Sequence, residues 1–155
     1  MIRCIPNFER IKLNNGEMDN CSFKSFFASD SIVLEGRFMY TDIDEMNTLM
    51  AKIISRADEL GSNKTMELCF FVDYYCTWSR KRIMMCLHQL GNIKRVSNGC
   101  SIQLVWGYDS DDDDIQEFGA LLAESSNMPI TYVNTDYEVY AQCKLATKNY
   151  VLEAN

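Results

Sequence analysis

One threonine stands at the boundary between an apolar run and a helical pattern, where a hydroxyl is accessible to chemistry. The run is residues 69–75, Cys-Phe-Phe-Val-Asp-Tyr-Tyr, which is rich in strand-forming residues and predicts a buried strand. Apolar residues then recur at helical spacing from Ile83, and Gly91 stands where that helix would end. Thr77 lies between the two elements as the natural N-cap of a helix over 78–90. Its hydroxyl can cap this helix or accept a covalent group.

A phosphate on Thr77 is the chemical alternative to capping. Its charge would face the unpaired N–H groups and the positive dipole end of the helix. Arg80 and Lys81, one turn into the helix, could pair with it. Aromatic residues also surround the threonine, as is typical of interaction surfaces: Tyr74, Tyr75 and Trp78. Spacing alone nevertheless favours the cap, which contributes about 1 kcal/mol.

An acidic run, residues 109–114, is the second candidate site. Carboxylates can gather Mg²⁺ or Ca²⁺, but the spacing D-S-D-D-D-D lacks the glycine and terminal glutamate of an EF-hand. A solvated cluster stabilised by a helix dipole therefore explains it better than a metal site. The run also follows a strand that we expect to neighbour the Thr77 strand. Asp111 and Asp112 are thus candidates for an electrostatic partner surface.

The thiols and the single histidine do not assemble an enzyme site. The chain has seven cysteines, none in a CxxC pair, and His88 is its one histidine, so an ordinary zinc site cannot form. Cys76 lies beside a helix N-terminus and basic residues, which lower a thiol pKa. However, His88 is about three helical turns away, too far to serve as its base. We expect reduced thiols, no metal, no cofactor and no catalytic residue.

Composition restricts the classes of partner. The 155 residues suit one domain, and the net charge of −7 argues against general binding to nucleic acid or anionic lipid. No apolar stretch is long enough to span a membrane, and the first residues lack the apolar core of a signal peptide. These features predict a cytoplasmic protein that binds neither nucleic acid nor a membrane.

The remaining elements follow from periodicity and turn residues. A β-hairpin is expected over 21–28 and 32–38, and a helix over 43–60, capped by Thr41 or Asp42 with Asp44 and Glu45 completing a capping box. Strands are expected at 65–75, 100–108 and 129–133, a loop at 91–99, and a short helix over 115–122. An edge strand could follow at 138–141. The order β-β-α-β-α-β-α-β predicts an α/β fold: one mixed sheet with an N-terminal hairpin and about three helices packed on it.

Three motifs carry a resemblance to the SiaC family of bacterial regulatory phosphoproteins, which is related in fold to STAS domains. The hairpin ends in Gly36-Arg37, the buried strand runs into Tyr74-Tyr75-Cys76-Thr77-Trp78-Ser79-Arg80-Lys81, and residues 104–114 read Leu-Val-Trp-Gly-Tyr followed by the acidic run. The resemblance covers roughly Phe23 to Val133. It implies a STAS-like domain over 21–133, preceded by an arm or strand over 1–20 and followed by an edge strand and tail over 134–155.

The same resemblance implies a phosphorylation switch. Thr77 matches the family threonine that a dedicated kinase phosphorylates and a metal-dependent serine/threonine phosphatase dephosphorylates. The unphosphorylated form would bind and activate a diguanylate cyclase, which links the switch to cyclic-di-GMP and biofilm formation. Partner contacts would come from residues around Thr77 and the acidic run: Tyr75, Cys76, Trp78, Ser79, Arg80, Lys81, Asp111 and Asp112.

Two other classes of function stay open. The chain could be a constitutive interaction module in which Thr77 is only a helix cap. It could also be an enzyme that uses Cys76 or the aspartate cluster, although it has no glycine-rich phosphate loop or nucleophile elbow.

Overall fold

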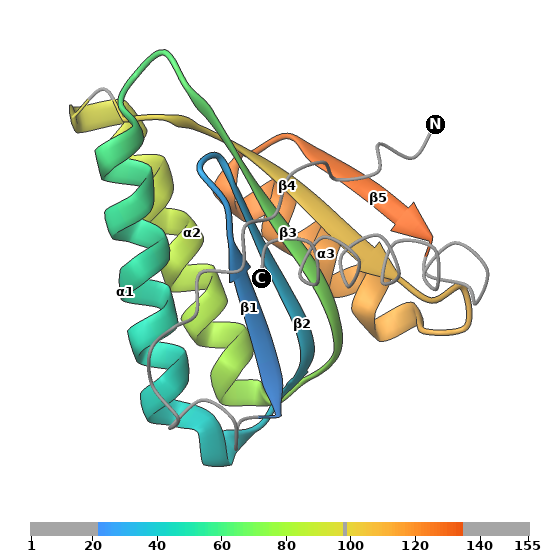
Figure 1. The fold of residues 1–155 in the computed structure, drawn as a ribbon. Coiled ribbons are helices and arrows are strands. Elements are labelled where there is room, and N and C mark those ends of the chain that lie inside the picture. The colour runs from blue at the N-terminus through green and yellow to red at the C-terminus, as the bar shows by residue number, and fades with distance from the viewer. Residues whose placement is uncertain (1–21, 98, 135–155) are drawn as a thin grey trace, which may run out of the picture.

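Five strands and three α-helices make up the described part of the chain, residues 22–97 and 99–134 of a computed structural model (Figure 1). The elements are β1 (Phe23–Phe27), β2 (Ser31–Phe38), the 3-10 turn η2 (Tyr40–Asp42), α1 (Ile43–Leu60), β3 (Thr65–Tyr75), α2 (Thr77–Ser97), β4 (Ser101–Tyr108), α3 (Asp113–Ser126) and β5 (Ile130–Asn134). Their order is the predicted one. The expected arm over 1–20 and the expected edge strand over 138–141 lie outside the described residues.

The strands form one sheet in the order β1-β2-β3-β4-β5. β1 pairs antiparallel with β2 as the predicted hairpin, and the other neighbours pair in parallel. Connections between parallel neighbours are almost always right-handed, so strands in this order place all three connecting helices on one face. Figure 1 shows α1 beside α2, with α3 next along the sheet. The predicted fold class is confirmed.

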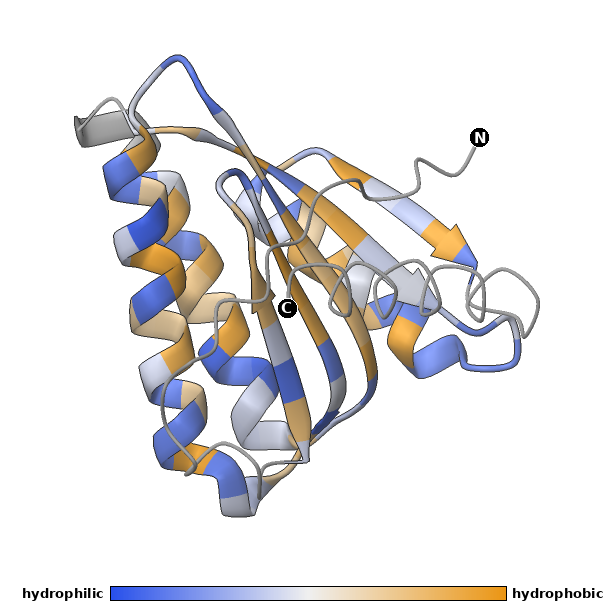
Figure 2. Cartoon of the chain, viewed as in Figure 1, coloured by the Kyte–Doolittle hydropathy of each residue, from blue (hydrophilic) through white to orange (hydrophobic). Residues whose placement is uncertain are grey.

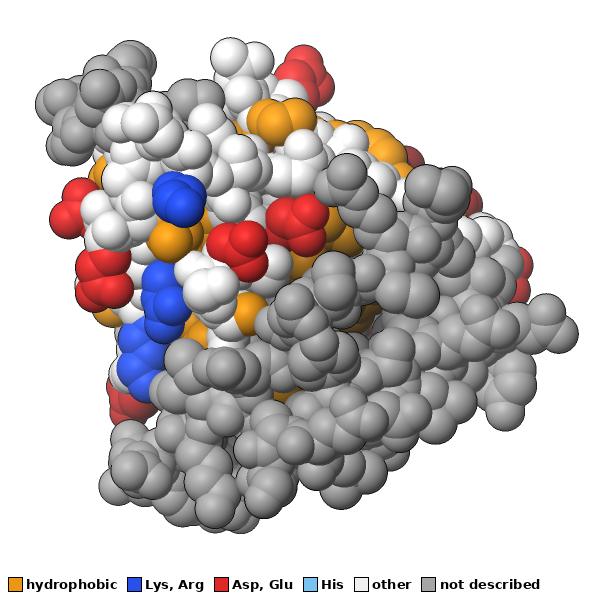
Figure 3. Space-filling view, turned by 45° about the horizontal axis from the view of Figure 1, so that its top comes forward, with side chains coloured by type: hydrophobic (Ala, Val, Ile, Leu, Met, Phe, Trp, Pro, Cys, Tyr) orange, Lys and Arg blue, Asp and Glu red, His pale blue; other side chains and the backbone are white. Residues whose placement is uncertain are grey.

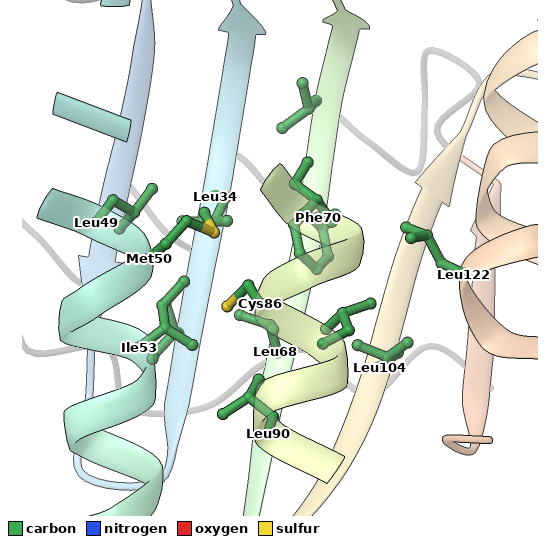
Figure 4. Packing of buried hydrophobic residues seen from close by; sticks show 14 of the residues in the cluster. Leu34, Leu49, Met50, Ile53, Leu68, Phe70, Cys86, Leu90, Leu104 and Leu122 are labelled. Carbon is green, nitrogen blue, oxygen red and sulfur yellow. The ribbon is translucent and has the colours of Figure 1, made fainter. Parts of the chain in front are cut away.

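The main core lies between the sheet and the three helices. Figure 4 shows Leu34, Leu68 and Leu104 on neighbouring strands, opposite Ile53 of α1 and Leu90 of α2. Figure 2 shows the same pattern as hydrophobic residues on the strands and polar ones on the outer sides of the helices. Burying one such side chain contributes about 1.5–3 kcal/mol, so this layer holds the fold together.

The surface of the described residues is mixed in character. Charged side chains of both signs lie among polar and hydrophobic ones on the face drawn in Figure 3. Large hydrophobic residues are exposed singly on several elements: Tyr40, Tyr74, Met85, Leu121 and Tyr132. Within the described ranges, no helix has the length and apolar character needed to cross a membrane.

The helix α1 has the predicted bounds, but the predicted capping interaction at its start is wrong. Asp42 occupies the N-cap position without a side-chain capping bond. Its carboxylate is buried and accepts hydrogen bonds from the backbone N–H and the hydroxyl of Ser22. A partner distant in sequence therefore takes the group that a local capping box would have used.

The predicted loop over 91–99 is also wrong, because α2 continues through Gly91 to Ser97. Glycine inside a helix costs about 1 kcal/mol relative to alanine, a cost that packing can offset. At this point α2 runs close to the end of α3, since a Cβ on Gly91 would lie 3.9 Å from the carbonyl oxygen of Ser126. The chain turns later, where the N–H of Gly99 donates to the carbonyl of Ile93 at 3.2 Å.

A β-bulge interrupts the pairing of β2 with β3 between Gly36 and Arg37. Gly36 has a φ of +106°, and a Cβ there would lie only 2.5 Å from the carbonyl oxygen of Ser22. That carbonyl accepts a hydrogen bond from the N–H of Arg37 at 2.9 Å. The position thus requires glycine both for its backbone conformation and for this close approach.

We predict that Gly36→Ala lowers the free energy of unfolding by about 2–4 kcal/mol, the sum of a strained φ and a backbone clash. Gly61→Ala is the matched control. Gly61 also has a positive φ, +79°, but no atom lies within 4 Å of its added Cβ, so it should lose only the conformational part. Urea denaturation of both variants measures the difference. An equal loss at the two positions would contradict the clash.

Candidate functional site

The turn after β3 and the turn after β4 lie at the same edge of the sheet. β3 ends at Tyr75 and β4 at Tyr108, and the two strands pair in parallel, so the expected adjacency of their ends is confirmed. The end of β2 joins them, because the N–H of Cys76 donates to the carbonyl of Phe38 at 3.1 Å. The carboxyl ends of parallel strands are where α/β proteins commonly bind ligands.

Cys76, and not Thr77, is the N-cap of α2. The carbonyl of Cys76 accepts the first helical hydrogen bond, from the N–H of Arg80 at 3.1 Å. Its Sγ accepts from the N–H of Ser79 at 3.4 Å, in the way that a serine or aspartate oxygen would. The predicted cap is therefore wrong by one residue. Because the N–H of Cys76 is still paired with β2, this residue stays outside the helix and the helix begins one position later.

Thr77 consequently has an exposed side chain on the first residue of α2. Among the described residues, no hydrogen bond occupies its hydroxyl. The first N–H groups of a helix have no partner within the helix and carry the positive end of its dipole. The hydroxyl therefore lies in a position that suits a negatively charged group.

Two of the expected partner contacts, Tyr75 and Ser79, lie beneath the surface. Ser79 is 0% exposed, and its hydroxyl donates to the carbonyl of Cys76 at 2.8 Å. Tyr75 is 4% exposed and stacks on Trp106, with ring centres 5.4 Å apart, and meets Phe118 edge to face. Burial raises the pKa of the Tyr75 hydroxyl well above its usual value, against the opposing charge of Arg80. These two side chains position the turn, and in this conformation neither presents a surface to a partner.

The basic and aromatic residues of the first helical turns differ in accessibility. Arg80 is half-buried, with its guanidinium carbon 4.9 Å from the ring centre of Phe118. Trp78 is partly buried against the core and carries Arg82 over its ring at 5.1 Å. Lys81 is exposed, one turn beyond Thr77. Within residues 22–97 and 99–134, Lys81 is therefore the cation of the expected pair that has no ring contact.

The acidic run forms a closed turn that leads into α3. The carboxylate of Asp109 accepts from the N–H of Asp111 at 2.9 Å, and the N–H of Asp112 donates to the carbonyl of Asp109 at 3.0 Å. Asp112 then caps α3 by accepting from the N–H of Ile115 at 3.1 Å. Of the two predicted contact residues, Asp111 is exposed and Asp112 is engaged as a cap. In residues 22–97 and 99–134, no three metal-binding side chains gather closely enough to hold an ion.

Sequence reasoning missed part of this edge, on β2 and just after it. Tyr40, in the turn η2, is 66% exposed. Arg37 lies over the ring of exposed Tyr74 at 5.1 Å, because the bulge after Gly36 brings these two residues opposite each other. Gly36 was the available signal, since a glycine inside a strand pattern often marks a bulge.

Comparisons with known proteins agree on one family. A family model described as SiaC family regulatory phosphoprotein matches residues 24–135. The structure of diguanylate cyclase SiaD in complex with its activator SiaC from Pseudomonas aeruginosa matches with a TM-score of 0.55 and 16% identity, over 74% of this chain and 94% of that chain. Apo-SiaC from the same organism matches with a TM-score of 0.57 and 16% identity, over 72% of this chain and 89% of that chain. No curated protein sequence matches this chain.

We predict that Cys76→Ala lowers the free energy of unfolding by about 0.5–1 kcal/mol, the lower part of the range for a lost helix cap because sulfur is a weak acceptor. Cys76→Ser should keep or improve stability. Thr77→Ala should change it by less than about 0.5 kcal/mol, as expected for a surface position without a partner. Chemical denaturation of the three variants tests the assignment. A larger loss for Thr77→Ala than for Cys76→Ala would return the cap to Thr77.

Proposed function

Since this chain belongs to the SiaC family of regulatory phosphoproteins, we propose that phosphorylation of Thr77 sets its partner binding and that the chain itself catalyses no reaction. The observation that carries the proposal is the exposed hydroxyl of Thr77 on the first residue of α2, not used as a cap. A phosphoryl group there adds about two negative charges beside unpaired helix N–H groups. The proposed activity needs no metal or cofactor held by this chain.

The mechanism is local. Tyr75 is fixed in an aromatic cluster and Ser79 is bonded to Cys76, so the turn is rigid on both sides of Thr77. A phosphate therefore changes the charge and shape of the surface without refolding the core. Lys81 is the exposed cation that can approach it, while Arg80 would first have to leave the ring of Phe118.

Three partners follow from this switch: a cognate protein kinase, a metal-dependent serine/threonine phosphatase and an effector that reads the unphosphorylated surface. We propose a diguanylate cyclase as the effector, which would place the chain in cyclic-di-GMP signalling and biofilm regulation in the cytoplasm. The support is the structure in which SiaC is the activator bound to the cyclase SiaD. Direct contacts would come from exposed or half-exposed residues: Cys76, Trp78, Arg80, Lys81, Asp111 and Asp112.

The competing proposal, a constitutive module in which Thr77 is only a cap, loses its main argument. Its premise was that the Thr77 hydroxyl serves only as the cap of this helix. Cys76 supplies that cap through its Sγ. Partner binding that ignores Thr77 still has to be tested directly.

Incubating the protein with its cognate kinase and MgATP should add one phosphoryl group, and peptide mass mapping should locate it on Thr77. Thr77→Ala should abolish the modification. Thr41→Ala is the matched control, because Thr41 is an exposed threonine just before α1 and should have no effect on labelling. Phosphate on another residue, with Thr77→Ala still accepting it, would refute the site.

Binding to the cyclase separates the switch from the constitutive module. Thr77→Asp adds a negative charge, and we expect the dissociation constant to rise at least tenfold, which corresponds to about 1.4 kcal/mol. Thr77→Asn has a similar size without the charge and should change the constant less than about threefold. Isothermal titration calorimetry measures both. Unchanged binding by Thr77→Asp would favour the constitutive module.

A further inference from the structure

The neighbouring helices α2 and α3 carry opposite charges. The sequence of α2 has no Asp or Glu and five basic residues: Arg80, Lys81, Arg82, Lys94 and Arg95. The sequence of α3 has no Lys or Arg and four acidic residues: Asp113, Asp114, Glu117 and Glu124. Both helices lie on the same face of the sheet and contact each other (Figure 1). A basic helix therefore lies beside an acidic one on one side of the molecule.

Four exposed residues of each helix form a row along its outer side. The row on α2 is Thr77, Lys81, Met85 and His88, and the row on α3 is Asp113, Glu117, Leu121 and Glu124. Both rows occupy the first, fifth, ninth and twelfth residues of their helix, a spacing that keeps side chains on one face. Met85 is 52% exposed and Leu121 is 50% exposed. Each row thus has one exposed apolar side chain among polar and charged ones.

The two rows lie at the same height along the sheet. Both helices connect parallel strands, so they run in the same direction. Near their starts, the guanidinium carbon of Arg80 lies 4.9 Å from the ring centre of Phe118. Further along, a Cβ on Gly91 would lie 3.9 Å from the carbonyl oxygen of Ser126. Each member of the α2 row is therefore roughly level with its counterpart on α3.

We propose that two copies of this chain associate through α2 and α3, about a two-fold axis parallel to these helices. The rotation places α2 of each copy against α3 of the other, with both helices in the same direction. Lys81 then meets Glu117 of the second copy, and Met85 meets its Leu121. The ring of His88 can donate a hydrogen bond to the second copy's Glu124. Every contact occurs twice, because a two-fold interface is self-complementary.

The charge pattern favours a second copy over an unrelated acidic partner. The α2 row needs an acidic helix with one apolar residue between its charges, and α3 supplies that pattern in register. Among the residues that the structure describes, Lys81, Glu117 and Glu124 form no ion pair within the chain. These charges are therefore available across an interface. Exposed ion pairs contribute about 0–1 kcal/mol each, so the dimer is a weak, transient one.

The dimer also covers the first residue of the α2 row, Thr77, which faces Asp113 of the second copy. A phosphoryl group on Thr77 would bring like charges together at this point and separate the two copies. This consequence rests on the proposed function, whereas the dimer of the unmodified chain does not.

Charge reversal on the full chain tests the pairing. Lys81→Glu sets carboxylates against each other across the interface and Glu117→Lys sets cations against each other. Each variant should therefore raise the dissociation constant of the dimer about tenfold or more, measured by sedimentation equilibrium. Lys64→Glu and Glu59→Lys are the matched controls, because both side chains are exposed and lie outside α2 and α3. Neither control should change the constant.

Mixing the two charge-reversed variants provides the rescue. An equal mixture of Lys81→Glu and Glu117→Lys should form a heterodimer with nearly the wild-type dissociation constant, because each Lys81–Glu117 contact again joins opposite charges. A misfolded variant could not be rescued in this way. A wild-type chain that stays monomeric up to about 1 mM, the weak end of specific association, would overturn the proposal. So would a mixture that associates no better than the single variants. No kinase is used, so either failure would leave the proposed phosphorylation of Thr77 untouched.

Discussion

The pairing of β3 with a parallel neighbour on each side is the constraint on which the rest of the structure depends. β3 lies between β2 and β4 and is buried on both faces for most of its length. A strand in that position needs apolar side chains in both directions, which explains its nearly continuous run of hydrophobic and aromatic residues. Its register fixes where Tyr75 stops, and therefore where the next residues leave the sheet.

The chemistry at the edge follows from this register. The N–H of Cys76 continues the pairing to Phe38, so Cys76 remains outside the helix and caps it. Thr77 then falls on the first helical residue with its side chain exposed. Tyr75, two residues before Thr77, stacks on Trp106. The helix α3 packs closely on the same Trp106 ring, because a Cβ on Gly119 would lie only 2.5 Å from it. A rigid base beneath an exposed hydroxyl is suited to a modification that is read at the surface.

Each face of the sheet carries its own hydrophobic cluster. One face packs against three helices in the order that right-handed connections impose. The other carries the second hydrophobic cluster, formed by Ala28, Val33, Cys69, Phe71 and Val105. The carboxyl edge of the sheet, with exposed Tyr40 and Tyr74, Lys81 and the acidic turn, is accessible to a partner.

The sequence by itself determined the elements and their order, because strand alternation and helical spacing are local patterns. The bounds of α1 and the glycine at its end are examples. What only the tertiary structure decided were the points where a distant partner competes with a local one. Ser22 donates hydrogen bonds to the carboxylate of Asp42, which therefore does not cap α1. The helix α2 continues past Gly91, where it lies close to the end of α3. Phe38 holds Cys76 in the sheet and moves the cap away from Thr77. Spacing along the chain cannot reveal such contacts, since their energy comes from residues brought together only when the sheet has formed.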